Sequence, residues 1–202
     1  MTIADWLTAG GAVTNPLFQT EGLHPVTFTR GAMLKLKRHP DFDAGLIGVV
    51  EAGLKDPSWQ GFVYLMHFGQ GAALDPLYVG KTEKKGTSRP LSFNIENIRT
   101  NQHAFGRWGY GLAYHIGDLS HVLFREAGYK KPAPKYERWA DCLFETRNPL
   151  QLRQPVFVTL VSWRDGMRGP SGLIGSAPAV EKELIALCGG TEGGRLLNVD
   201  GR

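Results

Sequence analysis

The stretch Phe62-Val63-Tyr64-Leu65-Met66 is a short apolar and aromatic run, and it decides how the rest of the chain is interpreted. Runs of β-branched and aromatic residues of this length are typical of a buried strand. Turn-prone residues 69–76 follow, and Leu77-Tyr78-Val79-Gly80 then forms a second run of the same kind. Because a loop of this length can join two neighbouring strands, the pattern predicts an antiparallel hairpin with a tyrosine on each strand.

The segments after this hairpin predict a mixed α/β (α+β) domain. Residues 81–90 form a basic loop, and residues 91–103 carry the apolar spacing of a helix. Residues 155–163 are rich in β-branched and aromatic residues and predict a strand, and residues 179–188 predict a second helix. Between them, residues 104–150 combine closely spaced glycine and aromatic residues with a proline-rich segment and a helix at 136–146. We interpret residues 104–150 as an insertion.

The first 60 residues are interpreted as an N-terminal helical extension. Apolar residues from Gly31 through Leu54 recur at helical spacing, and His39-Pro40 interrupts them, so two shorter helices are expected. The turn at Asp56-Pro57-Ser58 ends this segment. The predicted organisation is therefore an extension over residues 1–60 and a domain over residues 61–202.

Composition narrows the class of protein. Hydrophobic residues make up 42% of the 202 residues and charged residues 21%, as in compact globular proteins. Cys142 and Cys188 form no CxxC pair, so no structural zinc is expected. No stretch is long and apolar enough to span a membrane, and Met1 to Gly10 lack the basic start of a secretion signal. We therefore expect a cytoplasmic protein with no membrane partner.

The net charge of +4 and the isoelectric point of about 9.1 permit a polyanionic partner. Cations gather in one stretch in which the only acids are Glu83 and Glu96, and this stretch is either a DNA contact or a solvated loop. Its cations are Lys81, Lys84, Lys85, Arg89, Arg99 and Arg107. Gly80-Lys81-Thr82 does not complete a phosphate-binding loop, because Asp75 stands where that pattern needs its first glycine. No nucleotide cofactor is therefore expected.

Five landmarks in order resemble the GIY-YIG nuclease family. They are Phe62-Val63-Tyr64, Tyr78-Val79-Gly80, Arg99, Glu181-Lys182-Glu183-Leu184-Ile185 and Leu197-Asn198-Val199. The resemblance covers about 61–103 and 155–199. It departs from the family in two features, Phe62 where glycine is usual and a longer loop before Glu181. His103, four residues after Arg99, is similar to the restriction-enzyme branch of the family.

The resemblance implies a small three-stranded antiparallel sheet flanked by helices, and a metal-dependent DNA endonuclease. A type II restriction-like enzyme acting on double-stranded DNA is the first hypothesis. A structure-dependent repair or mobile-element nuclease, and a non-catalytic DNA-binding module, are the alternatives. One Mg²⁺ or Mn²⁺ ion would be held by Glu181, for which Glu183 is the competing ligand. A homodimer is the expected assembly if both strands are cut, because a site with one metal cuts one strand per event.

The resemblance assigns a role to each matched residue. Tyr64 would be the general base, its phenolate made accessible by the metal and Lys81. Tyr78 would orient water or phosphate, or pack in the core. Arg99 and His103, on one helix face, would grip the scissile phosphate. Asn198 would hold the hairpin or a site water, or be a turn residue. The expected substrate-binding cations are Lys81, Lys84, Lys85 and Arg107.

The insertion interleaves aromatic residues with cations. Such a surface can stack on bases and hold phosphates, or its aromatic residues can pack the core of a subdomain. The residues concerned are Arg107, Trp108, Tyr110, Tyr114, His115, Lys130, Lys131 and Lys135.

Overall fold

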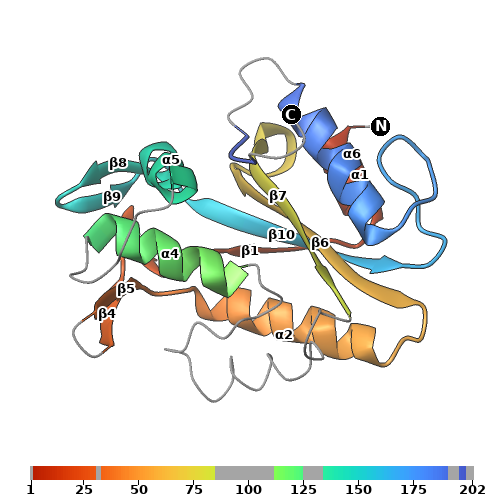
Figure 1. The fold of residues 1–202 in the computed structure, drawn as a ribbon, viewed down its shortest axis with the longest axis horizontal. Helices are drawn as coiled ribbons and strands as arrows, with labels where there is room; N and C mark the ends of the chain where they lie inside the picture. The colour runs from red at the N-terminus through yellow and green to blue at the C-terminus, as the bar shows by residue number, and fades with distance from the viewer. Residues whose placement is uncertain (1, 31–32, 85–111, 125–133, 191–195, 199–202) are drawn as a thin grey trace.

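The computed structural model describes residues 2–30, 33–84, 112–124, 134–190 and 196–198, and its centre is a four-stranded antiparallel sheet (Figure 1). The strand order is β1-β10-β6-β7. The strands span Val13–Pro16 (β1), Val156–Arg164 (β10), Trp59–Phe68 (β6) and Asp75–Glu83 (β7). The long strand β6 therefore lies between β10 and β7.

The predicted hairpin is confirmed. Strands β6 and β7 pair antiparallel through a connection that contains the short 3-10 helix η1, Gly71–Ala73. Tyr64 lies opposite Gly80 on one side and opposite Leu160 of β10 on the other. The predicted strand over residues 155–163 is thus the neighbour of the first hairpin strand.

Helices cover both faces of the sheet, because apolar residues occupy both sides of β6 (Figure 1). Val63 and Leu65 face one core with helices α1 and α6, whereas Phe62 and Tyr64 face a second core with α2, α4 and α5. The helices span Ile3–Ala9 (α1), Pro40–Leu54 (α2), Leu112–Phe124 (α4), Pro134–Leu143 (α5) and Ala177–Gly189 (α6).

Three small hairpins complete the described part of the chain. They pair Thr20–Glu21 (β2) with His24–Pro25 (β3), Thr27–Arg30 (β4) with Met33–Leu36 (β5), and Phe144–Arg147 (β8) with Leu150–Leu152 (β9). None of the helices in the described residues combines the length and apolar character needed to cross a bilayer.

The mixed α and β class is confirmed, but the expected three-stranded sheet is wrong. The fourth strand, β1, comes from the first 60 residues and pairs with β10 from Val13 opposite Leu160 to Pro16 opposite Phe157. The first 60 residues are therefore not only helical.

Two predicted helix boundaries are also wrong. The expected first helix after Gly31 is replaced over Met33–Leu36 by strand β5, and the helix begins only at Pro40. The N-cap residue of α2 is His39, whose ring nitrogen accepts a hydrogen bond from the Asp41 backbone. The helix predicted over residues 136–146 ends at Leu143, because Phe144 starts the β8–β9 hairpin. The helix predicted over residues 91–103 lies outside the described residues.

Candidate active site at strand β7

The ring of Tyr64 lies directly over the backbone of Gly80 on the neighbouring strand. A Cβ atom built on Gly80 would come within 2.3 Å of both Cζ and the hydroxyl oxygen of Tyr64. This contact leaves no room for any side chain at position 80. The glycine of the second motif therefore allows the first tyrosine to extend from β6 across β7, the outer strand on that side of the sheet.

Tyr64 is a buried, neutral phenol. Its side chain is only 3% exposed, and burial raises its pKa well above the ordinary value near 10. Nearby Tyr78, Glu181 and Tyr136 raise the pKa of Tyr64 further, and Tyr64 shares a side-chain hydrogen bond with Tyr78. The expectation of an accessible phenolate therefore does not describe the protein as it stands.

Tyr78 belongs to an aromatic cluster that the insertion contributes to. The cluster consists of Tyr78, His115, Tyr136 and Trp139. Trp139 and His115 lie 5.0 and 5.3 Å from the Tyr78 ring between centroids. The ring nitrogen Nδ1 of His115 lies 2.7 Å from the hydroxyl oxygen of Tyr136. Helices α4 and α5 thus cover the tyrosine face of the hairpin.

Lys135 holds its ammonium group against this aromatic cluster. Its Nζ lies 4.8 Å from the Tyr78 ring centroid and 5.6 Å from that of Trp139, within the range of a cation–π contact. It also donates a 3.4 Å hydrogen bond to the Tyr78 hydroxyl. Burial, with a smaller contribution from the charge of Lys135, lowers the pKa of His115 to about 3, so that ring is neutral.

Glu181 approaches the same hairpin from helix α6 on the opposite face of the sheet. Leu184 and Ile185, three and four residues later, are buried in the core and hold this face of the helix against β6 and β7. Burial raises the pKa of the half-buried Glu181 carboxyl, although the charges of Lys81 and Lys182 lower it. The Glu181 charge in turn helps to raise the pKa of Tyr64.

Glu183 contacts the loop that precedes helix α6. Its carboxylate accepts a hydrogen bond from the Ser171 backbone and lies where a Cβ on Gly169 would overlap it. Glu183 therefore anchors the loop before α6. Of the two carboxylates in the motif, Glu181 is the one whose charge raises the pKa of Tyr64.

The two described basic residues of the predicted substrate-binding set are at different places. Lys81 lies on β7 and forms an ion pair with Glu83. Lys84 lies just beyond the end of the strand, where its Nζ donates to the carbonyl of Asp56 at 3.4 Å. Of these two lysines, Lys81 is the one whose charge lowers the pKa of Glu181.

Asn198 fastens the end of the chain to strand β7. Its Nδ2 donates to the Val79 carbonyl at 2.8 Å, and its Oδ1 accepts from the Val79 N–H at 2.9 Å. The neighbouring Leu197 N–H donates to the Leu77 carbonyl at 2.7 Å. The Asn198 side chain thus holds the backbone of Val79 through both its amide oxygen and its amide nitrogen. Val79 is the residue between Tyr78 and Gly80.

The structure brings Tyr64 and Tyr78 together on one face of the sheet, with ring centroids 6.1 Å apart. Glu181 approaches from the other face, where the charge of Lys81 lowers its pKa, and Asn198 supports the strand. The predicted residues Lys85, Arg99, His103 and Arg107 lie outside the described residues. The sequence interpretation missed Tyr136 and Trp139. Their spacing of three residues, which places them on one helix face, is the signal that could have found them.

The site offers few oxygen ligands for a hard cation such as Mg²⁺. Within the described residues, no group of three or more His, Cys, Asp or Glu side chains is arranged to hold a metal ion. Glu181 offers one half-buried carboxylate whose raised pKa reflects poor solvation of its charge, which a cation would relieve. The described residues therefore offer one carboxylate, and a Mg²⁺ ion held there would need to take most of its ligands from other molecules.

No protein-family model matches the chain, and neither a curated protein nor a solved structure matches it significantly.

Proposed function

We propose that the chain is a metal-dependent DNA endonuclease of the GIY-YIG type. The observation that supports this most directly is that the charge of Glu181, from a helix on one face of the sheet, helps to raise the pKa of the Tyr64 phenol on the other. Lys81 lowers the pKa of Glu181, and Tyr78 raises the pKa of Tyr64. A carboxylate, a cation and two phenols around one strand are groups suited to phosphodiester hydrolysis.

Each of these side chains would have its own role in phosphodiester hydrolysis. Glu181 would hold the metal ion, which when bound supplies positive charge beside the phosphoryl oxygens. Lys81 would leave Glu83 and bind a substrate phosphate as a point charge. Tyr64, as a neutral phenol, would hold the attacking water by a hydrogen bond, and its raised pKa argues against a free phenolate in the resting protein. Asn198 would keep the strand in place.

The insertion would contribute to the same site. Lys135, steadied by the aromatic cluster and bonded to the Tyr78 hydroxyl, adds a cation on the face that carries both tyrosines. That position suits an interaction with the DNA backbone, which dominates the affinity of such proteins. Arg99 and His103 retain their predicted roles at the scissile phosphate.

The proposed biological role is that of a restriction enzyme. We favour a restriction-like enzyme on double-stranded DNA, acting in the cytoplasm, and as a dimer if both strands are cut. Digestion of methylated and unmethylated plasmid would separate this role from structure-dependent nicking, since only restriction predicts discrete fragments confined to unmethylated DNA.

The test of the proposal is cleavage of supercoiled plasmid by the purified chain with Mg²⁺ or Mn²⁺. Glu181→Gln should abolish cleavage and leave DNA binding measurable by fluorescence anisotropy. The matched control is Glu183→Gln, two residues along the same helix, because glutamine can still accept from the Ser171 backbone. Cleavage by Glu181→Gln would refute the role of Glu181. A wild-type chain that binds DNA but cuts none of these substrates would instead support the non-catalytic DNA-binding module.

A further inference from the structure

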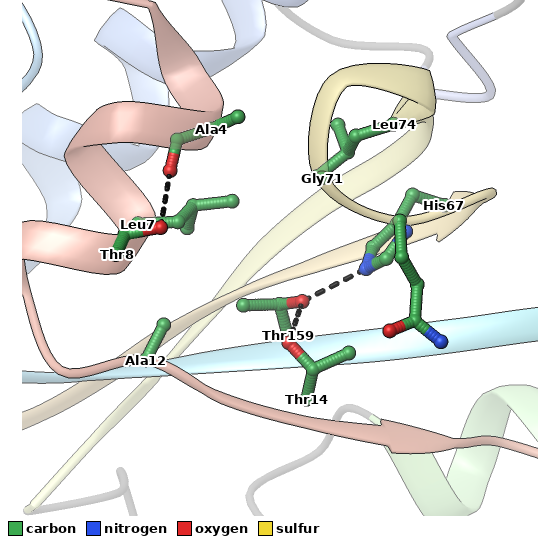
Figure 2. A pocket seen from close by; sticks show the side chains of 10 residues that line it. Ala4, Leu7, Thr8, Ala12, Thr14, His67, Gly71, Leu74 and Thr159 are labelled. Carbon is green, nitrogen blue, oxygen red and sulfur yellow. Dashed lines mark hydrogen bonds between the residues drawn. The ribbon is translucent and has the colours of Figure 1, made fainter.

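A second polar site lies away from the tyrosines, in a pocket between helix α1, strand β1 and the β6–β7 connection (Figure 2). Its volume is about 130 Å³. A cavity on the order of 150 Å³ can hold a molecule the size of benzene. The pocket is therefore of a size to take one small molecule.

The pocket has two unlike walls. Ala4, Leu7, Ala12 and Leu74 supply apolar surface, whereas Thr14, Thr159 and His67 form a row joined by hydrogen bonds (Figure 2). The described residues that line it include no charged side chain at neutral pH. Such a lining suits an uncharged molecule with a polar end and an apolar body.

The direction of the hydrogen bonds in this row is fixed by His67. Its Nδ1 lies 2.9 Å from the Gly69 carbonyl oxygen, and a carbonyl only accepts, so Nδ1 carries the hydrogen. The ring is 1% exposed, and burial lowers its pKa, so it is neutral at physiological pH and Nε2 presents a lone pair. The His67 tautomer is thus determined by its backbone partner.

The rest of the row follows from this tautomer. The Thr159 hydroxyl, 2.8 Å from Nε2, must donate its only hydrogen to His67. The Thr14 hydroxyl, 2.7 Å from that of Thr159, must then donate to Thr159. Thr14 and Thr159 lie opposite each other on paired strands, so the sheet register holds both in place. At the exposed end of the row, Thr14 is left with lone pairs and no hydrogen to offer.

We propose that this pocket binds a small uncharged molecule that carries a hydroxyl or N–H donor on an apolar body, with the Thr14 hydroxyl oxygen as the acceptor. A ligand that can only accept finds no donor at this end of the row. The Thr14 end of the row therefore selects for donors by the direction of its hydrogen bonds, whereas the exposed amide of Gln70, which also lines the pocket, can donate or accept. The apolar wall adds affinity for the body of the molecule in proportion to the area it covers.

The probes that test this are phenol and fluorobenzene, which have the same ring and differ in the donor. Binding of each to the full-length ¹⁵N-labelled chain is followed by NMR at the backbone amides of Thr14, Gly71 and Leu74. We expect both probes to shift these amides and phenol to bind about two- to tenfold more tightly, the effect of one net hydrogen bond. Absence of shifts, or equal affinities for the two probes, would overturn the proposal.

Two variants and one control locate the effect. Thr14→Val should remove the preference for phenol and leave the affinity for fluorobenzene unchanged. Thr8→Val is the matched control, since the Thr8 hydroxyl also lines the pocket but donates to the Ala4 carbonyl of its own helix. Ala4→Leu should fill the cavity and abolish binding of both probes. A preference for phenol that survives Thr14→Val, or binding that survives Ala4→Leu, would show that the assignment is wrong.

Discussion

The contact between Gly80 and Tyr64 makes a quantitative prediction about stability. Alanine is ordinarily better than glycine in a strand, because it restricts the unfolded chain. At position 80, however, the added methyl group would come within 2.3 Å of the Tyr64 ring and hydroxyl. The ring has little space to move, since it is 3% exposed and packs against Phe62 and Tyr78 at centroid distances of 6.3 and 6.1 Å. Gly80→Ala should therefore destabilise the protein.

The size of the effect follows from the cost of overpacking a core, which is about 1–3 kcal/mol. Tyr64→Ala removes the ring and should cost about 3–5 kcal/mol by itself, as other large buried aromatic residues do. In the double variant the methyl group occupies space that the ring has left. The double variant should thus lose less stability than the sum of the two single variants, by about 1–3 kcal/mol.

The assay is urea-induced unfolding of the four proteins of this cycle, with Gly48→Ala as the control. Gly48 lies in helix α2, and a Cβ atom there would meet nothing within 4 Å. Gly48→Ala should therefore raise the free energy of unfolding by about 0.5–1 kcal/mol. The reasoning is refuted if Gly80→Ala is neutral or stabilising, or if the two changes at positions 64 and 80 are additive within about 0.5 kcal/mol.

Two further predictions concern the residues around β7. Asn198→Ala leaves the buried N–H and C=O of Val79 without their partners, so it should lower the free energy of unfolding by about 2–4 kcal/mol. It should also speed hydrogen exchange at the Val79 amide. Unchanged exchange at Val79 would contradict the assignment of these two hydrogen bonds to Asn198. Because burial raises the pKa of Glu181, its charge destabilises the folded protein at neutral pH, so Glu181→Gln should increase the free energy of unfolding there. That increase should vanish as the pH falls below the ordinary glutamate value of 4.5, and a difference that stays constant with pH would count against it.

The elements predicted correctly are those in which local conformational propensity agrees with the position of the residues in the fold. Strands β6 and β10 are long, β-branched and aromatic, and they are buried on both sides between two other strands. In helix α6, the apolar residues Val180, Leu184 and Cys188 recur every four residues and face one core. For such segments, local propensity and tertiary packing favour the same conformation.

The elements predicted wrongly are short and depend on distant partners. Strand β1 is only the four residues Val13–Pro16, and asparagine and proline within it are poor strand formers. It becomes a strand because β10, more than 140 residues later, offers an unpaired edge. Met33–Leu36 has apolar residues that suit a helix equally well, but pairs with β4 and packs against α4. Four-residue segments hold too little periodicity to separate the two.

At the candidate site, the sequence predicted which residues are present but not the environment that sets their protonation. The motif residues named Tyr64, Lys81 and Glu181, and the structure places the first two on the hairpin strands and Glu181 on helix α6, which packs against β7. They could not indicate the protonation of Tyr64, because that depends on burial, to which the insertion contributes. The aromatic cluster puts Trp139 beside Tyr78 and helps to close off the tyrosine face. Helices α4 and α5 therefore pack directly against the candidate site, so the segment interpreted as an insertion sets the environment of both tyrosines.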